Sequence, residues 1–313
     1  MSAFECVTFR NSRGMRLIGM LHQPPPESAR GICILMLSPG MKGRVGPHSL
    51  YLKFAERLVP LGFHLLRFDF YGLGDSEGEL TEDVLADMYN AIQGGRYVDD
   101  TIAAMDWMQA EHGIKRFVGS GLCGGSITSL LTAQRDPRIF ALLGIGLPAV
   151  RDVGEANWGR VLTAQQVQQV RRGFVERMLR PASWRKFLTG KSNYRVIWRM
   201  LTQVFRPAKP VGPVATAKPE TAVVDDTNPH FAPAFFSLIE SGRPAILVYS
   251  GGDRLQSQFE EKFELRNRPR LRDGRPGYEV HTIQQANHIM SAPEWVDELC
   301  SVAAAWLQAS TKS

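Results

Sequence analysis

Three side chains that could act together in nucleophilic catalysis lie shortly after stretches of the sequence that we expect to be strands. These stretches cover residues 116–120, 245–250 and 278–283, and the side chains that follow them are Cys123, Asp253 and His288. A histidine can remove the proton of a thiol and return it to a leaving group, and a carboxylate can orient the imidazole and stabilise its cation. The sequence therefore predicts a triad in which Cys123 is the nucleophile, His288 the base and Asp253 the acid.

The segment around Cys123 has the composition of a sharp turn from a strand into a helix. It reads Gly119-Ser-Gly-Leu-Cys-Gly-Gly-Ser126, and a helix-compatible stretch continues to Ala133. Gly121 and Gly125 lie two positions either side of Cys123, where small residues let a strand and a helix pack closely around a strained turn. A cysteine at a helix N-terminus beside an imidazolium favours the thiolate form.

Acyl transfer at such a nucleophile needs two backbone N–H groups that bind the developing oxyanion. Gly124, the residue after the nucleophile, offers one of them. Met41 offers the other, because it follows Pro39-Gly40 in the loop after the apolar run 31–37. We therefore expect Gly124 and Met41 to form the oxyanion hole.

Apolar runs and helix-like segments alternate along most of the chain. We expect strands over 4–10, 16–22, 31–37, 63–68, 116–120, 139–147, 245–250 and 278–283. Helical spacing of apolar residues is found over 48–61, 97–111 and 293–308. This alternation predicts an α/β fold with a mostly parallel, doubly wound sheet, and open sheets of this type carry their sites at the carboxyl ends of the strands.

The alternation stops over residues 148–241, where no clear strand is found. We expect this stretch to be a helical cap with a Pro-rich linker at 206–219, inserted between two parts of one core at 1–147 and 242–313. Trp158, Trp184 and Trp198 could line an acyl pocket there, although packing within the cap explains them equally well. Basic residues outnumber acidic ones between 151 and 206. This excess is typical either of a solvated surface or of a positively charged surface that binds an anionic partner.

The motifs together resemble the α/β-hydrolase superfamily over residues 15–308. Pro39-Gly40-Met41 is similar to its oxyanion-loop motif, and Asp69-Phe-Tyr-Gly-Leu-Gly-Asp-Ser76 is similar to the Asp-x-x-Gly-x-Gly-x-Ser segment of serine aminopeptidases and lysophospholipases. The resemblance implies the α/β-hydrolase fold and the chain order nucleophile, acid, histidine. A cysteine in place of the usual serine resembles dienelactone hydrolases and polyhydroxyalkanoate synthases.

Composition adds few constraints. The chain has 313 residues, is 44% hydrophobic and carries a formal charge of +6, as an ordinary globular protein does. We see no signal peptide, membrane span, metal-binding spacing, cofactor motif or nucleic-acid recognition motif. Cys6, Cys33 and Cys300 fall in predicted strands or a helix and are expected to be inert core thiols, which suits the cytoplasm. His281, Asp225 and Asp226 are weaker rivals for catalytic roles.

The function expected from these residues is an acyl-transferring hydrolase, a thioesterase or esterase, that forms an acyl thioester on Cys123. Its substrate would be a small acyl compound, carried either free or on coenzyme A or an acyl carrier protein. One alternative is an acyltransferase or condensing enzyme that passes the acyl group to an acceptor other than water. Another is a binding module that keeps the fold without catalysis.

Overall fold

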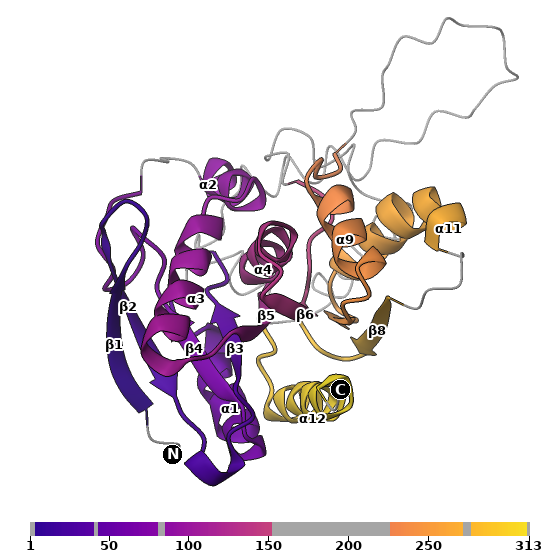
Figure 1. Ribbon diagram of the computed structural model, residues 1–313. Helices are drawn as coiled ribbons and strands as arrows, with labels where there is room; N and C mark the ends of the chain where they lie inside the picture. Colours follow the sequence, from indigo (N-terminus) through magenta and orange to yellow (C-terminus); the bar gives the residue numbers. More distant parts are fainter. Residues whose placement is uncertain (1–3, 41–42, 81–84, 152–225, 272–276, 312–313) are drawn as a thin grey trace, which may run out of the picture. The chain divides into compact units, whose positions relative to one another are not determined.

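The computed structural model describes residues 4–40, 43–80, 85–151, 226–271 and 277–311. Their strands form one eight-stranded sheet in the order β1-β2-β4-β3-β5-β6-β7-β8 (Figure 1). The strands are β1 (Phe4–Arg10), β2 (Arg16–His22), β3 (Ile32–Leu37), β4 (His64–Phe68), β5 (Arg116–Leu122), β6 (Ile139–Ile145), β7 (Ala245–Ser250) and β8 (Tyr278–Ile283). Strand β2 pairs antiparallel with β1 and β4, and every other pairing between these strands is parallel. The predicted mostly parallel, doubly wound sheet is confirmed.

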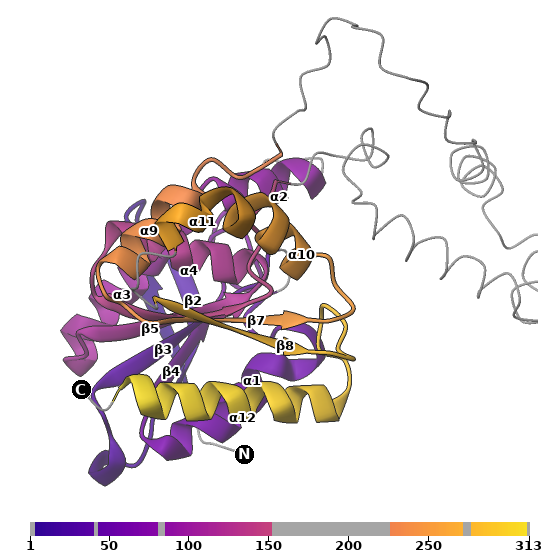
Figure 2. The same ribbon diagram turned by 90° about the vertical axis from the view of Figure 1, so that its right-hand side faces the viewer.

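Helices cover both faces of this sheet. They are α1 (Leu50–Leu58), α2 (Leu85–Gln93), α3 (Val98–His112), α4 (Gly124–Arg135), α9 (Phe231–Glu240), α10 (Leu255–Phe259), α11 (Leu265–Leu271) and α12 (Pro293–Ser310). Figure 2 shows α1 and α12 on one side of the sheet and α3, α4 and α9 on the other. No helix among the described residues is long and apolar enough to cross a membrane.

The central strand β3 shows why the sheet needs two covering layers. All six of its side chains are buried. Ile32, Ile34 and Met36 pack in the core cluster that contains α1 and α12. The alternate residues Cys33, Leu35 and Leu37 pack in the cluster that contains α3 and α4. A continuous apolar run of this kind is typical of a parallel strand with a helix layer on each face.

Strands β6 and β7 pair directly although residues 146–244 separate them in the chain. The chain after β6 and the chain before α9 also lie together, through a bridge between Val150 and Thr227 and a hydrogen bond of 3.0 Å from the Asn228 N–H to the Ala149 carbonyl. Helix α9, which falls within the predicted cap range 148–241, packs against α4 in the sheet-covering layer. Residues 152–225, the remainder of that range, lie outside the described residues.

One expectation about the first strand is wrong. Cys6 is exposed, because β1 is an edge strand that buries only alternate residues, Val7 and Phe9. Cys33 and Cys300 are buried, as expected.

The end of β3 and the start of α4 approach each other so closely that side chains cannot fit between them. A Cβ atom at Gly125 would lie 2.1 Å from the Leu37 carbonyl oxygen, and one at Gly121 would lie 2.6 Å from the same atom. The obstructing atoms belong to the backbone, so no rotamer change could relieve these contacts. Glycine is therefore required at both positions.

This contact predicts a large loss of stability for Gly125→Ala. Overpacking against backbone in a close-packed core should lower the free energy of unfolding by more than about 3 kcal/mol. Gly113→Ala is the matched control, because Gly113 has a φ of +68° but open space around it, so only the left-handed strain of about 1–2 kcal/mol applies. Urea unfolding of both variants measures the difference. Equal losses would show that the approach of α4 to β3 is not a constraint.

Candidate active site

Cys123 is the one residue between the end of β5 at Leu122 and the start of α4 at Gly124. Its φ of 52° and ψ of −106° are unusual for a residue with a side chain, and such strained conformations cluster at functional sites. The turn is fixed on both sides, because the Cys123 N–H donates to the Ile145 carbonyl at 2.8 Å and the Cys123 carbonyl accepts from the Ile127 N–H at 3.1 Å. The thiol is partly exposed.

Tyr51 of α1 holds the strand ends beneath this turn. Its hydroxyl donates to the Leu37 carbonyl at 2.7 Å and accepts from the Leu122 N–H at 2.9 Å. The ring is fully buried, and burial raises the pKa of Tyr51 far above its ordinary value, so the phenol keeps its proton. Tyr51 thus joins the ends of β3 and β5 one residue before Cys123. Sequence reasoning missed this residue, since a tyrosine on a helix face carries no local sign of its distant partners.

Asp253 and His288 lie in the loops after β7 and β8. Asp253 Oδ2 is hydrogen-bonded to His288 Nδ1, and Asp253 Oδ1 accepts from the Arg254 N–H at 2.6 Å. The two loops are also joined by backbone bonds, from the Gly251 N–H to Ile283 at 2.9 Å and from the Gly252 N–H to Ala286 at 3.0 Å. These backbone hydrogen bonds therefore fix the position of the Asp253 carboxylate relative to the His288 imidazole.

The electrostatics favour a charged imidazole. Burial alone would lower the pKa of His288, but its hydrogen bonds to Asp253 and Cys123 outweigh burial and raise the pKa to about 10. Burial would raise the pKa of Asp253, yet the hydrogen bond from His288 and the N–H groups of Arg254 and Leu255 lower it below its ordinary value. The structure thus brings Cys123, His288 and Asp253 together, with His288 able to hold a proton beside the Asp253 carboxylate.

Of the two predicted oxyanion donors, only Gly124 is described. It is the first residue of α4, where backbone N–H groups lack acceptors within the helix. A Cβ atom at Gly124 would lie 3.1 Å from the Gly40 nitrogen, so the loop after β3 lies directly against the turn. Met41 lies outside the described residues, as do Trp158, Trp184 and Trp198.

Helix α2 was not anticipated, and it contacts this part of the site. A Cβ atom at Gly40 would lie 3.0 Å from Tyr89 Cε1, and one at Gly124 would lie 3.3 Å from Ile92 Cγ2. Helix α2 therefore forms one wall beside the loop and the turn. The spacing of Leu85, Met88 and Ile92 is the helical signal that could have indicated it.

The other residues considered for catalytic roles are His281, Asp225 and Asp226. His281 pairs with Glu298 at 3.0 Å, and Asp226 is buried, while Asp225 lies outside the described residues. Within the described ranges no group of three His, Cys, Asp or Glu side chains could hold a metal ion.

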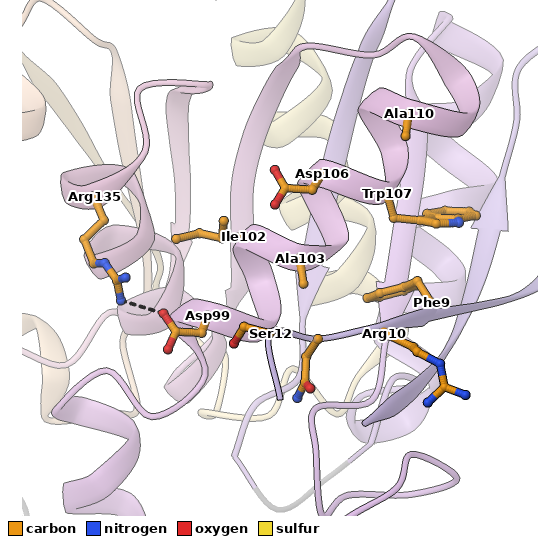
Figure 3. A pocket seen from close by; sticks show the side chains of 11 residues that line it. Phe9, Arg10, Ser12, Asp99, Ile102, Ala103, Asp106, Trp107, Ala110 and Arg135 are labelled. Atoms are coloured by element: carbon orange, nitrogen blue, oxygen red, sulfur yellow. Dashed lines mark hydrogen bonds and ion pairs between the residues drawn. The ribbon is translucent and has the colours of Figure 1, made fainter. Parts of the chain in front are cut away.

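A surface pocket of about 610 Å³ lies elsewhere, between the β1–β2 hairpin and α3. Figure 3 shows Trp107 and Phe9 on one side of it and the Asp99–Arg135 pair on another. None of the triad residues lines this pocket. It therefore does not belong to the Cys123 site.

Comparisons with known proteins place the fold. No family model matches the chain. A Bacillus subtilis protein, YtaP, that is named provisionally as a hydrolase is 29% identical over 96 residues, which cover 28% of this chain and 32% of YtaP. The match thus spans about a third of that relative.

Solved structures match over nearly the whole chain. The esterase domain of a Rhodothermus marinus protein aligns with a TM-score of 0.54 at 17% identity and covers 99% of this chain and 100% of its own. The esterase Pf2001 of Pyrococcus furiosus aligns with a TM-score of 0.59 at 14% identity, over 99% and 92% of the two chains. An α/β serine hydrolase homologue from Coxiella burnetii gives 0.52 at 14%, with 97% of each chain covered. The chain has the α/β-hydrolase fold.

The raised pKa of His288 predicts how stability depends on pH. The folded value of about 10 exceeds the ordinary value of 6.5, so the stabilisation is fully present below pH 6.5 and is lost as the pH rises toward 10. We expect the excess of the unfolding free energy of the wild type over that of His288→Gln to decrease across this range. Urea unfolding at several pH values measures it. In an Asp253→Asn background the decrease should be smaller, and a difference that stays constant with pH would contradict the assignment.

Proposed function

We propose that this protein is an acyl-transferring hydrolase, an esterase or thioesterase, that acts through an acyl thioester on Cys123. The observation that carries the proposal is the position of His288, which is hydrogen-bonded to Asp253 and lies close enough to Cys123 for that residue to help raise the pKa of the imidazole. The fold shared with the esterases of Rhodothermus marinus and Pyrococcus furiosus supports it. A binding module would have no need for a strained cysteine, an imidazole and a carboxylate in this order.

In the first half of the reaction, the Cys123 thiolate attacks the carbonyl carbon and a C–S bond forms. The negative charge moves to the carbonyl oxygen, which the Gly124 N–H stabilises together with the predicted Met41 N–H. When the tetrahedral intermediate collapses, the bond to the leaving group breaks and the His288 imidazolium gives that group its proton. The products are the acyl enzyme and the free alcohol or thiol.

In the second half, water releases the acyl group. Acylation removes the effect of Cys123 on the raised pKa of His288 and leaves that of Asp253. The neutral imidazole then takes a proton from water as the water oxygen attacks the thioester carbon. Collapse of this second intermediate breaks the C–S bond, which leaves the acid product and restores the thiolate–imidazolium pair. Asp253 stays ionised and orients the ring.

A cysteine nucleophile restricts the substrate class. A thiolate leaves a tetrahedral intermediate more readily than an alkoxide does, so attack is productive only when the substrate's own leaving group is good. Thioesters, activated esters and enol lactones meet this condition, and unactivated amides do not. The acyl enzyme also stays activated, so an acceptor other than water would turn the same chemistry into acyl transfer.

The proposal predicts a covalent adduct confined to Cys123. Incubation with acyl thioesters, quenched early and followed by intact-protein mass measurement, should show a transient acyl mass on the wild type. Cys123→Ala should lose the adduct and at least about 10³-fold of the turnover, as removal of a nucleophile does. Cys6→Ala is the matched control, because Cys6 is also exposed to reagent but lies on β1, and it should behave as the wild type.

The outcomes separate the alternatives. Turnover to free acid without a lasting adduct means a hydrolase, and an adduct discharged only by an added amine or alcohol means a transferase. Unchanged turnover in Cys123→Ala would eliminate the proposed mechanism.

The basic residues of the segment 152–225 suggest a charged carrier for the acyl group. We expect Arg171→Ala/Arg172→Ala/Arg177→Ala to raise the KM for an acyl-coenzyme A several-fold, with a strong dependence on salt. The same acyl group on pantetheine lacks the nucleotide phosphates and serves as the control, so its KM should not change. Equal effects on both substrates, or no effect on either, would contradict the hypothesis that these basic residues bind an anionic carrier.

A further inference from the structure

Tyr51 contacts the chain just before Cys123, although it lies in α1, far from Cys123 in the sequence. Its hydroxyl accepts a hydrogen bond from the Leu122 N–H at 2.9 Å, and Leu122 immediately precedes Cys123. The same hydroxyl donates to the Leu37 carbonyl at 2.7 Å. The hydroxyl therefore lies between the last residues of β3 and β5, where the pairing of these strands ends with Leu37 and Gly121.

The Leu37 carbonyl also contacts the chain after Cys123. Its oxygen is the atom that a Cβ at Gly125 would approach to 2.1 Å, so the first turn of α4 lies directly against it. The hydrogen bond from the buried Tyr51 hydroxyl fixes the direction of this carbonyl. Tyr51 thus restrains the chain on both sides of Cys123, directly at Leu122 and through Leu37 at Gly125.

The conformation between these two restraints is an unfavourable one. Cys123 has a φ of 52° and a ψ of −106°, and a residue with a side chain keeps such a conformation only where its surroundings impose it. Burial is the main cause of the raised pKa of Tyr51, and Cys123 raises that pKa further. Burial lowers the pKa of His288, and Asp253 and Cys123 raise it. Cys123 is therefore close to both Tyr51 and His288.

We propose that Tyr51 is a positioning residue that holds the Cys123 thiol beside His288. The inference rests on the proposed function in one respect, the role of Cys123 as the nucleophile that His288 assists. The neutral hydroxyl adds no charge to the site, but it fixes the backbone from which the thiol projects. Without the hydroxyl, two buried backbone groups lose a hydrogen-bond partner, and the strained turn is free to relax away from the imidazole.

The pKa of His288 reports whether the thiol is in place. NMR measures it from the pH dependence of the imidazole Cε1–H signal, and the wild-type value should be about 10. Cys123→Ala should lower this pKa by about 1–2 pH units, which corresponds to the loss of a hydrogen bond to a charged group. We expect Tyr51→Phe, which removes only the hydroxyl, to lower the pKa by about half as much, because the thiol is displaced rather than removed.

The double variant Tyr51→Phe/Cys123→Ala separates positioning from support of the fold. If Tyr51 acts by holding the thiol, the double variant should have the same pKa of His288 as Cys123→Ala alone. If Tyr51 only supports the fold around His288, its loss should change the pKa equally in both backgrounds. Equal changes, or no change in either background, would overturn the inference. An unchanged pKa in Cys123→Ala itself would overturn it too, because the thiol would then have no influence on the imidazole.

Tyr278→Phe is the matched control for the loss of a tyrosine hydroxyl. The Tyr278 hydroxyl donates to Glu264 at 2.6 Å and lies at the start of β8, the opposite end of that strand from His288. Its removal should leave the pKa of His288 at the wild-type value. A decrease as large as that in Tyr51→Phe would overturn the inference, because the effect would then not depend on contact with Leu122 and Leu37.

Gly46→Ala tests the inference if Tyr51→Phe does not fold. A Cβ atom at Gly46 would lie 3.1 Å from Tyr51 Cδ1, so the added methyl group must displace the buried ring and its hydroxyl. The pKa of His288 should fall here as well, to a smaller degree, and an unchanged value would contradict the inference. Gly113→Ala is the control, because its φ of +68° matches the +69° of Gly46 while the space around Gly113 is open.

The measurement needs no substrate, so its failure differs from a failure of the proposed function. An enzyme that is acylated at Cys123, but in which Tyr51 and Cys123 affect His288 independently, would overturn the inference alone. Acyl transfer that persists in Cys123→Ala would overturn the proposed function, and the thiol held beside His288 would then have no catalytic role.

Discussion

The contact between the start of α4 and the end of β3 is the constraint on which the site depends. Gly125 and Gly121 allow the Leu37 carbonyl to approach the turn to a distance that no side chain would permit. This approach lets Cys123 occupy its strained conformation, between a strand that ends at Leu122 and a helix that begins at Gly124. Cys123, the start of α4 and the end of β3 are brought together by this one contact between backbones.

The second requirement is charge balance around His288. The imidazole binds between the Asp253 carboxylate and the Cys123 thiol, and these two groups overcome the effect of burial on its pKa. The two partners come from opposite sides of residues 146–244, so their meeting depends on the direct pairing of β6 with β7 and of β7 with β8. The sheet therefore assembles the site, and the long intervening segment does not interrupt it.

Much of the fold could be predicted because its signals are local. The apolar run of β3, the turn glycines around Cys123 and the polar loops after β7 and β8 all lie within a few residues of the elements that they specify. The errors arise where neighbours decide burial. Cys6 is exposed because its side chain lies on the opposite face of β1 from the buried Val7 and Phe9. The packing of α9 on α4 could not be predicted either, because nothing in the sequence of α9 shows which helix it contacts.

The sequence by itself determined the order of strands and helices and the three residues that follow β5, β7 and β8, because hydrophobic period and turn composition are properties of short segments. Only the tertiary structure decided that the Tyr51 hydroxyl joins Leu37 to Leu122. The same holds for Asp69, which binds Arg44 in another loop, and for α2, which lies against Gly40. Hydrogen bonds and packing between distant segments depend on how the whole chain folds, so no short segment of the sequence encodes them.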